Sequence, residues 1–143
     1  MKKLRIKNCR IIVICTIILL PVTLIMINNP LLRTDAAVRR HLLRVTPIGT
    51  CIEDVIRIAN NRYDWTVENI RLDAGLSMHP SIPRSPIRFV RGDERFPTVG
   101  KQAVHIYFGT YQFIVRYSIE GFYAFNEEGK LIDIFVARDF DLP

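Results

Sequence analysis

The sequence predicts an α+β protein: an N-terminal transmembrane helix, then two short helices packed on an antiparallel sheet of three to four strands. Three observations predict it: an uncharged apolar run near the N-terminus, two segments with apolar residues at helical spacing, and an alternating C-terminal third. Since the helices precede the strands and do not alternate with them, a parallel α/β sheet is disfavoured. The expected domains are a cytoplasmic basic flank with a membrane anchor at 1–32 and an exported α+β domain at 33–143.

The apolar run covers residues 11–27 and carries no charge, whereas five cations and no acid precede it. As a helix it would span about 26 Å, slightly less than the roughly 30 Å of a bilayer's hydrocarbon core. Residues 28–32 at the interface would close that difference. The positive flank predicts a cytoplasmic N-terminus, which places the C-terminal domain outside the cytoplasm.

The same run also has to be weighed as a cleaved signal peptide. A signal core is about 7 to 15 residues long and is followed soon by small residues, whereas this run is longer and is followed by Asn, Asn, Pro, Leu, Leu and Arg. Thr34-Asp35-Ala36 offers small residues but lies far from the apolar end. We therefore expect a single-pass anchor retained in the cell membrane. A secreted or periplasmic protein, formed by signal cleavage, is the alternative.

The net charge of +6 comes almost entirely from the N-terminus. Five of the twenty cations lie in the first ten residues, which leaves fifteen cations against fourteen acids in the rest of the chain. The excess charge is thus a targeting feature and not a binding surface. Nucleic-acid binding, which depends on a basic patch, is not expected.

Two segments of the exported part predict helices. In residues 31–45 the apolar residues Val38, Leu42 and Val45 recur at helical spacing, and Asp35 suits a cap or the first turn. In residues 50–61 Thr50 and Glu53 have the spacing of a capping box. The apolar residues that follow recur at i, i+3, i+4 and i+7 and are Ile52, Val55, Ile56 and Ala59.

Residues 73–100 predict a long loop with at most short strands, because they hold four prolines and three glycines and show no sustained period. The loop is basic and the last quarter of the chain is acidic, so we expect the loop to lie across the sheet.

The C-terminal third predicts the sheet. Alternation begins at Ala103, Gly109-Thr110 is expected to be a turn, and further strands are expected at 112–117, 121–125 and 131–138. Residues 126–130, with Gly129 available for a positive φ, predict a hairpin loop.

Two stretches resemble a known family. PIGTCIEDVIRI is similar to the turn and helix start of the small outer-membrane-assembly lipoproteins, which share a fold with the β-lactamase inhibitor protein. YAFNEEGKLIDIFV resembles their closing hairpin, and together the two likenesses cover about half of the exported part. The resemblance implies a scaffold or protein-binding module without catalysis. This chain departs from the family in having no cysteine in a lipidation context.

No enzyme is expected, because the sequence offers only one nucleophile set. Cys51 is the single cysteine of the exported part, and its partners would be His79 or His105 with an acid. No recognisable signature surrounds Cys51, so its simplest reading is a small, partly buried apolar residue. A small thiol-dependent enzyme using Cys51 is the alternative.

Metal ions and cofactors are not expected either. The three histidines, at positions 41, 79 and 105, lack ligand spacing, and no cysteine pair exists in the exported part. The tripeptide Arg91-Gly92-Asp93 has the sequence of an integrin-type recognition motif. A motif of three residues often occurs by chance, so we interpret it as a solvated turn.

Aromatic residues are the best candidates for a binding surface. The predicted strands are rich in them, and a sheet face or edge that stays uncovered would meet a partner protein. The candidate protein-binding residues are Tyr107, Tyr111, Phe113, Tyr117 and Tyr123. In the alternative interpretation, the helices and the long loop cover both faces of the sheet. The expected function is that of a non-enzymatic envelope protein of scaffold or assembly type. The alternative binding function is that of an exported inhibitor or immunity-type protein.

Overall fold

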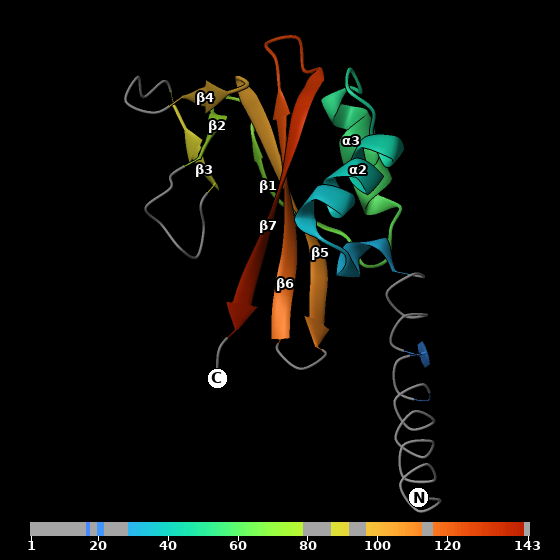
Figure 1. The fold of residues 1–143 in the computed structure, drawn as a ribbon. Coiled ribbons are helices and arrows are strands. Elements are labelled where there is room, and N and C mark those ends of the chain that lie inside the picture. Colours follow the sequence, from blue (N-terminus) through green and yellow to red (C-terminus); the bar gives the residue numbers. More distant parts are fainter. Residues whose placement is uncertain are drawn as a thin grey trace, which may run out of the picture. The chain divides into compact units, whose positions relative to one another are not determined.

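A four-stranded antiparallel sheet forms the centre of the fold in the computed structural model (Figure 1). The structure describes residues 29–78, 87–91, 97–112 and 116–141, together with Ile17, Leu20 and Pro21. The chain divides into two units, Met1–Arg33 and Thr34–Pro143, and each is described by itself. The first unit contains a short 3-10 helix, Pro30–Leu32.

No helix among the described residues is long and apolar enough to cross a membrane. Most of the predicted anchor, residues 11–27, lies outside the described residues.

The main sheet has the strand order β1-β5-β6-β7, and its strands are antiparallel throughout. Its bounds are β1 (Thr66–Arg71), β5 (Gln102–Gln112), β6 (Arg116–Phe125) and β7 (Leu131–Asp141). The α+β class is confirmed. Strand β1 was not predicted, because its residues are mostly exposed and show no apolar alternation.

Two helices cover one face of the main sheet, as predicted (Figure 1). They are α2 (Asp35–Val45), which contacts β7, and α3 (Ile52–Asn60), which contacts β1. Each buries its apolar stripe, which consists of Val38 and Leu42 in α2 and of Ile52, Val55 and Ala59 in α3. The first helix begins at Asp35, four residues later than the expected bound.

The capping box predicted at Thr50 is wrong. Cys51 is the N-cap of α3 and makes no side-chain cap, and the Thr50 hydroxyl donates to the carbonyl of Pro47 at 2.6 Å. The first helical N–H, that of Ile52, donates instead to the carbonyl of Gly129 at 3.0 Å. The helix start is thus satisfied by the backbone of the β6–β7 hairpin loop and not by its own side chains.

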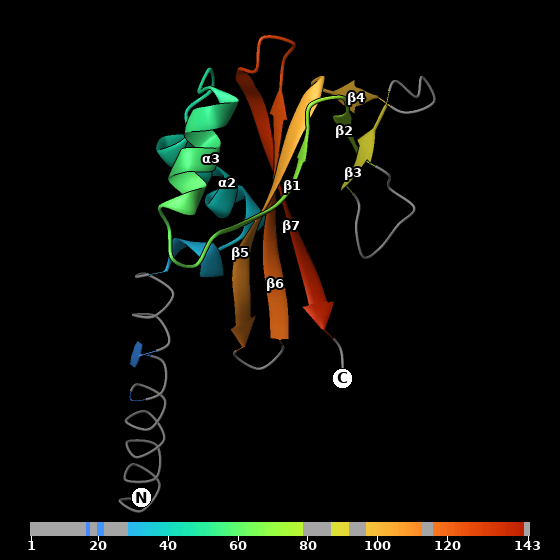
Figure 2. The same cartoon turned by 180° about the vertical axis from the view of Figure 1, so that it is seen from behind.

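The segment expected to be a long loop contains a second, three-stranded sheet. Its strands are β2 (Gly75–Met78), β3 (Ile87–Val90) and β4 (Thr98–Val99), in the order β3-β2-β4. This sheet lies on the side of the main sheet opposite the helices (Figures 1 and 2). Leu76 and Ile87 pack there against Ala103, Phe122 and Ala124, so the contact is apolar and not the charge pairing we expected.

The turn predicted at Gly109-Thr110 is also wrong. Strand β5 runs through both residues, and the pairing with β6 shifts between Tyr107 and Thr110. Gly109 has φ +110°, which is a conformation suited to glycine, so the pair forms a bulge and not a chain reversal. The hairpin loop at 126–130 is confirmed, with the N–H of Asn126 donating to the carbonyl of Lys130 at 2.9 Å.

Candidate functional site

Three aromatic rings from three neighbouring strands lie together at one end of the main sheet. Tyr111 in β5 is directly opposite Tyr117 in β6, which is directly opposite Phe140 in β7. The ring centroids are 6.2 Å apart for Tyr111 and Tyr117, and 6.0 Å apart for Tyr117 and Phe140. We call these three residues the aromatic end of the sheet.

The aromatic end belongs to the face that the helices cover, but it lies beyond them. Along β6, Tyr117 alternates in phase with Ile119 and Tyr123, which are buried in the core on the helix side. The distal halves of β5, β6 and β7 extend past α2 and α3 (Figures 1 and 2). Phe140 is 53% exposed, and Tyr111 and Tyr117 are half-buried.

Arg138 marks the border between the covered and the uncovered part of this face. Its guanidinium lies 5.3 Å from the centre of the Tyr117 ring and donates from Nε to Asp35 Oδ1 at 2.5 Å. Asp35 lies in the first turn of α2, where a carboxylate is favoured by the helix dipole. The ion pair therefore fixes the start of α2 next to the aromatic end.

The remaining predicted aromatic residues do not join this group. Tyr107 pairs with Glu120 on the opposite face, and its hydroxyl contacts the hydroxyl of Thr110. Phe113 lies outside the described residues. Tyr123 is completely buried, so its assignment to a binding surface is replaced by a place in the core. Phe140 was missed, because the last strand was expected to end at residue 138 and continues to Asp141.

Tyr123 has a strongly shifted pKa. Burial raises the pKa of its hydroxyl well above the ordinary value, and nearby Thr46 offsets a part of that rise. The hydroxyl has no hydrogen-bond partner among the described residues. A deeply buried phenol with a raised pKa stabilises the fold through its ring and does not serve as an acid or a base at neutral pH.

A second candidate is an open hollow of about 450 Å³ between the main sheet and β3. Its lining includes Arg71, Arg88 and Phe89. At its base His105 stacks on Phe122, with centroids 4.4 Å apart, and its Nε2 lies 3.2 Å from Glu120 Oε2. The side chain of His105 is only 18% exposed. The histidine and the glutamate of the hollow thus pair with each other, so the hollow is the weaker candidate.

Cys51 and His105 are not brought together. Cys51 caps α3 on the helix side, whereas His105 lies on the face that the second sheet covers. The ammonium of Lys130 donates to the Cys51 sulfur at 2.8 Å, and this hydrogen bond raises the pKa of Lys130. Among the described residues, no group of three or more His, Cys, Asp or Glu side chains is arranged to hold a metal ion.

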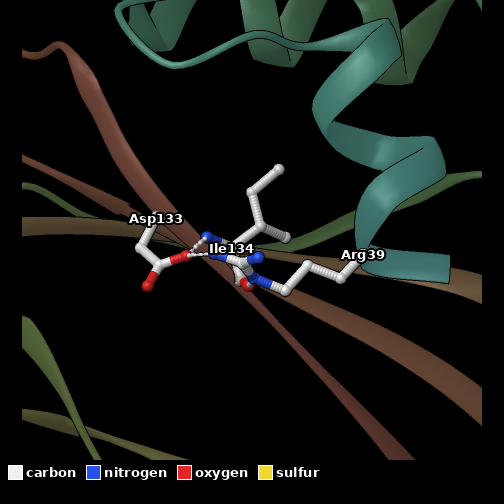
Figure 3. Close-up of polar contacts among 3 residues, drawn as sticks. All are labelled: Arg39, Asp133 and Ile134. Carbon is white, nitrogen blue, oxygen red and sulfur yellow. Dashed lines mark hydrogen bonds and ion pairs between the residues drawn. The ribbon is translucent and has the colours of Figure 1, made fainter. Parts of the chain in front are cut away.

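The outer edge of β7 is occupied by a side chain from α2 (Figure 3). Arg39 donates from Nε to the carbonyl of Ile134 at 2.9 Å, and its terminal nitrogen contacts Asp133 Oδ1 at 2.5 Å. The same Asp133 oxygen accepts the N–H of Ile134 at 2.7 Å. We call Arg39, Asp133 and Ile134 the edge clasp, because together they satisfy both backbone groups of one edge residue.

Arg39→Met is expected to lower the free energy of unfolding by about 0.5–1.5 kcal/mol, since it removes a half-exposed ion pair and the donor to Ile134. Urea unfolding of the full chain measures this. Arg40→Met is the matched control, because the exposed Arg40 makes, among the described residues, only a long hydrogen bond to the carbonyl of Ala36. Equal unfolding midpoints for the two variants would show that the clasp does not stabilise the fold.

No family model matches the chain, and it is similar to no curated protein and to no solved structure. The resemblance to the outer-membrane-assembly lipoproteins therefore stays a prediction.

Proposed function

We propose that the protein is a non-enzymatic, membrane-anchored envelope protein whose exported domain binds another protein through the aromatic end of its main sheet. One observation carries this proposal: Tyr111, Tyr117 and Phe140 meet on a face where the helices end, and Phe140 stays half-exposed. Clustered aromatic rings with polar rims are typical of the centre of protein interfaces.

The residues around the three rings also support the aromatic end as the binding surface. Tyr111 and Tyr117 each combine a flat apolar ring with a hydroxyl, and Arg138 adds a charged group stacked on Tyr117. Tyrosine and arginine are enriched in interfaces because they bury area and still form hydrogen bonds. The three strands that hold the rings are paired to one another, so the cluster is presented by a rigid element.

The proposed location rests on the N-terminal sequence. Five cations followed by an uncharged run at 11–27 favour a single-pass anchor with the domain outside the cytoplasm. The likeness to the outer-membrane-assembly lipoproteins agrees with a scaffold role at the cell envelope. An exported inhibitor or immunity-type protein would use the same aromatic end, and differs in being released by cleavage.

Site-specific photo-crosslinking in intact membranes tests the proposal. A photoreactive residue at position 111 is expected to give a crosslinked protein product, because that position lies in the cluster. The double variant Tyr117→Ser/Phe140→Ser is expected to reduce this product at least about tenfold, which is the scale of losing two aromatic contacts. The same membranes give the mature mass: the full chain supports the anchor, and a cut after Ala36 would contradict it.

Tyr63→Ser is the matched control, since Tyr63 is a fully exposed aromatic residue in the loop after α3. Its crosslinked product is expected to be unchanged. The proposal is wrong if the double variant and the control give the same yield of product.

A thiol-dependent enzyme remains the alternative that one contact favours. The Lys130 ammonium beside the Cys51 sulfur is the kind of neighbour that activates a thiol. If Cys51→Ser abolishes an activity found by substrate screening, this alternative replaces the binding proposal.

A further inference from the structure

The first half of the outer edge of β7 is closed by other parts of the domain. The N–H of Leu131 donates to the carbonyl of Thr50 at 2.9 Å, and its carbonyl accepts the N–H of Gly49 at 2.8 Å. Three residues on, the edge clasp satisfies both backbone groups of Ile134 (Figure 3). An unpaired edge invites pairing with another chain, so closing it protects the domain.

The second half of the same edge is open at Val136 and Phe140. In an antiparallel strand the backbone groups of alternate residues point to the same side, so Val136, Arg138 and Phe140 direct theirs outward, as Ile134 does. Within the described part of the chain, the outward groups of Val136 and Phe140 have no hydrogen-bond partner. Apart from β6, to which it is paired, no labelled helix or strand runs beside the distal half of β7 in either view of the fold (Figures 1 and 2).

The side chains that flank this open edge differ between the two faces of the sheet. On the helix side, Phe140 contacts the ring of Tyr117, so an incoming strand would find an apolar surface. On the opposite side, Asp139 alternates with Ala137 and is only partly buried. A strand added here would therefore meet an apolar neighbour and an acidic neighbour at consecutive positions.

A second copy of this chain fits the open edge poorly. Two-fold pairing centred at Arg138 or at Asp139 would place like charges directly opposite each other, which destabilises a strand pair. Pairing centred at Ala137 would bring Phe140 of one copy against Ile134 of the other, where the edge clasp already occupies the backbone. The charges thus favour a different chain.

We propose that the open edge of β7, through the outward backbone groups of Val136 and Phe140, accepts an extended segment of a partner protein as an added strand. The segment carries a basic residue opposite Asp139 and, next to it in sequence, an apolar residue that packs on Phe140. This inference rests on the proposed binding function and specifies its mode, in which backbone hydrogen bonds hold the segment and the two side chains select it.

A peptide library displayed on phage and selected against the full chain in detergent micelles provides the probe. We expect enriched peptides with a basic residue adjacent to an apolar one, and the strongest of them is then titrated against variants. Val136→Pro removes only the outward N–H, a position where an edge strand tolerates proline, and is expected to weaken binding at least about tenfold. Val136→Ala keeps that N–H and is expected to bind as the original chain does.

Asp139→Lys is the second variant, and it tests the inference even if Val136→Pro fails to fold. Reversal of this charge is expected to lower the affinity for the peptide at least about tenfold at low salt. Hydrogen exchange on the complex is expected to protect the amides of Val136 and Phe140.

The outcomes separate the two claims. Suppose that Tyr117→Ser/Phe140→Ser lowers the affinity for the peptide but Val136→Pro and Asp139→Lys do not. The partner then binds the aromatic end without adding a strand, so the strand-addition inference is wrong and the proposed binding function stands. If none of these variants changes the affinity for the peptide, both the strand-addition inference and the proposed binding function are wrong. Light scattering that shows a dimer lost in Val136→Pro would make a second copy the occupant and overturn the choice of a different chain.

Discussion

Tyr123→Ala is expected to lower the free energy of unfolding by about 3–5 kcal/mol, which is a large part of the 5–15 kcal/mol typical of a domain. The Tyr123 side chain is completely buried where β6 faces the helices, so truncation leaves a cavity the size of an aromatic ring. Urea unfolding of the full chain, followed by circular dichroism, measures the loss. A loss below about 1 kcal/mol would contradict the central place of this ring.

Tyr123→Phe is the matched control and should leave stability unchanged or slightly higher, because the hydroxyl has no described hydrogen-bond partner. The variant also tests the sign of the pH dependence. Burial raises the pKa of Tyr123 in the folded state, so above about pH 10 the unfolded state loses the proton first. The free energy of unfolding then falls with rising pH, and Tyr123→Phe should reduce that fall.

Gly75→Ala is expected to cost about 1–3 kcal/mol and to loosen the second sheet from the main sheet. A β-carbon at position 75 would lie 2.3 Å from the Gly100 carbonyl oxygen and 2.9 Å from that of Val99, so the backbone of β2 or β4 must move. Movement there separates Leu76 from its apolar contacts with Ala103 and Phe122. Urea unfolding and the binding of a dye specific for exposed apolar surface measure the two effects.

Ser77→Ala lies on the same strand and provides the control. The Ser77 hydroxyl is buried without a hydrogen-bond partner among the described residues, so its removal should be neutral or stabilising. If Gly75→Ala matched Ser77→Ala in midpoint and in dye binding, the close approach of β2 to Gly100 would not constrain the fold.

The helices and the closing hairpin could be predicted because their signals are local. Val38 and Leu42 recur at helical spacing, and Gly129 supplies the positive φ of the loop. The second sheet could not be predicted, because its strands are short and are stabilised by contact with Phe122, which lies far along the chain. The bulge at Gly109 was mistaken for a turn, since both features use a glycine at positive φ.

The candidate site was predicted only in part, for a reason of the same kind. Alternation places Tyr117 and Tyr123 on one face of β6, but it does not tell where the helices end along that face. Tyr123 lies under the helices and Tyr117 lies beyond them, so identical residue types have opposite roles. The edge clasp depends on Arg39 and Asp133, which lie 94 residues apart, so no local pattern reveals it.

The backbone bonds between the start of α3 and the β6–β7 hairpin also determine when the domain can finish folding. Ile52 donates to Gly129 and Leu131 donates to Thr50, so the start of α3 is completed by a segment that lies far later in the chain. Contacts of such long sequence separation slow folding, because a large loop must close before they form. The apolar face of α2 would therefore stay exposed until β7 has formed, because β7 is a strand that α2 contacts. A chain ending before β7 would lack this strand contact and the backbone donor to Thr50.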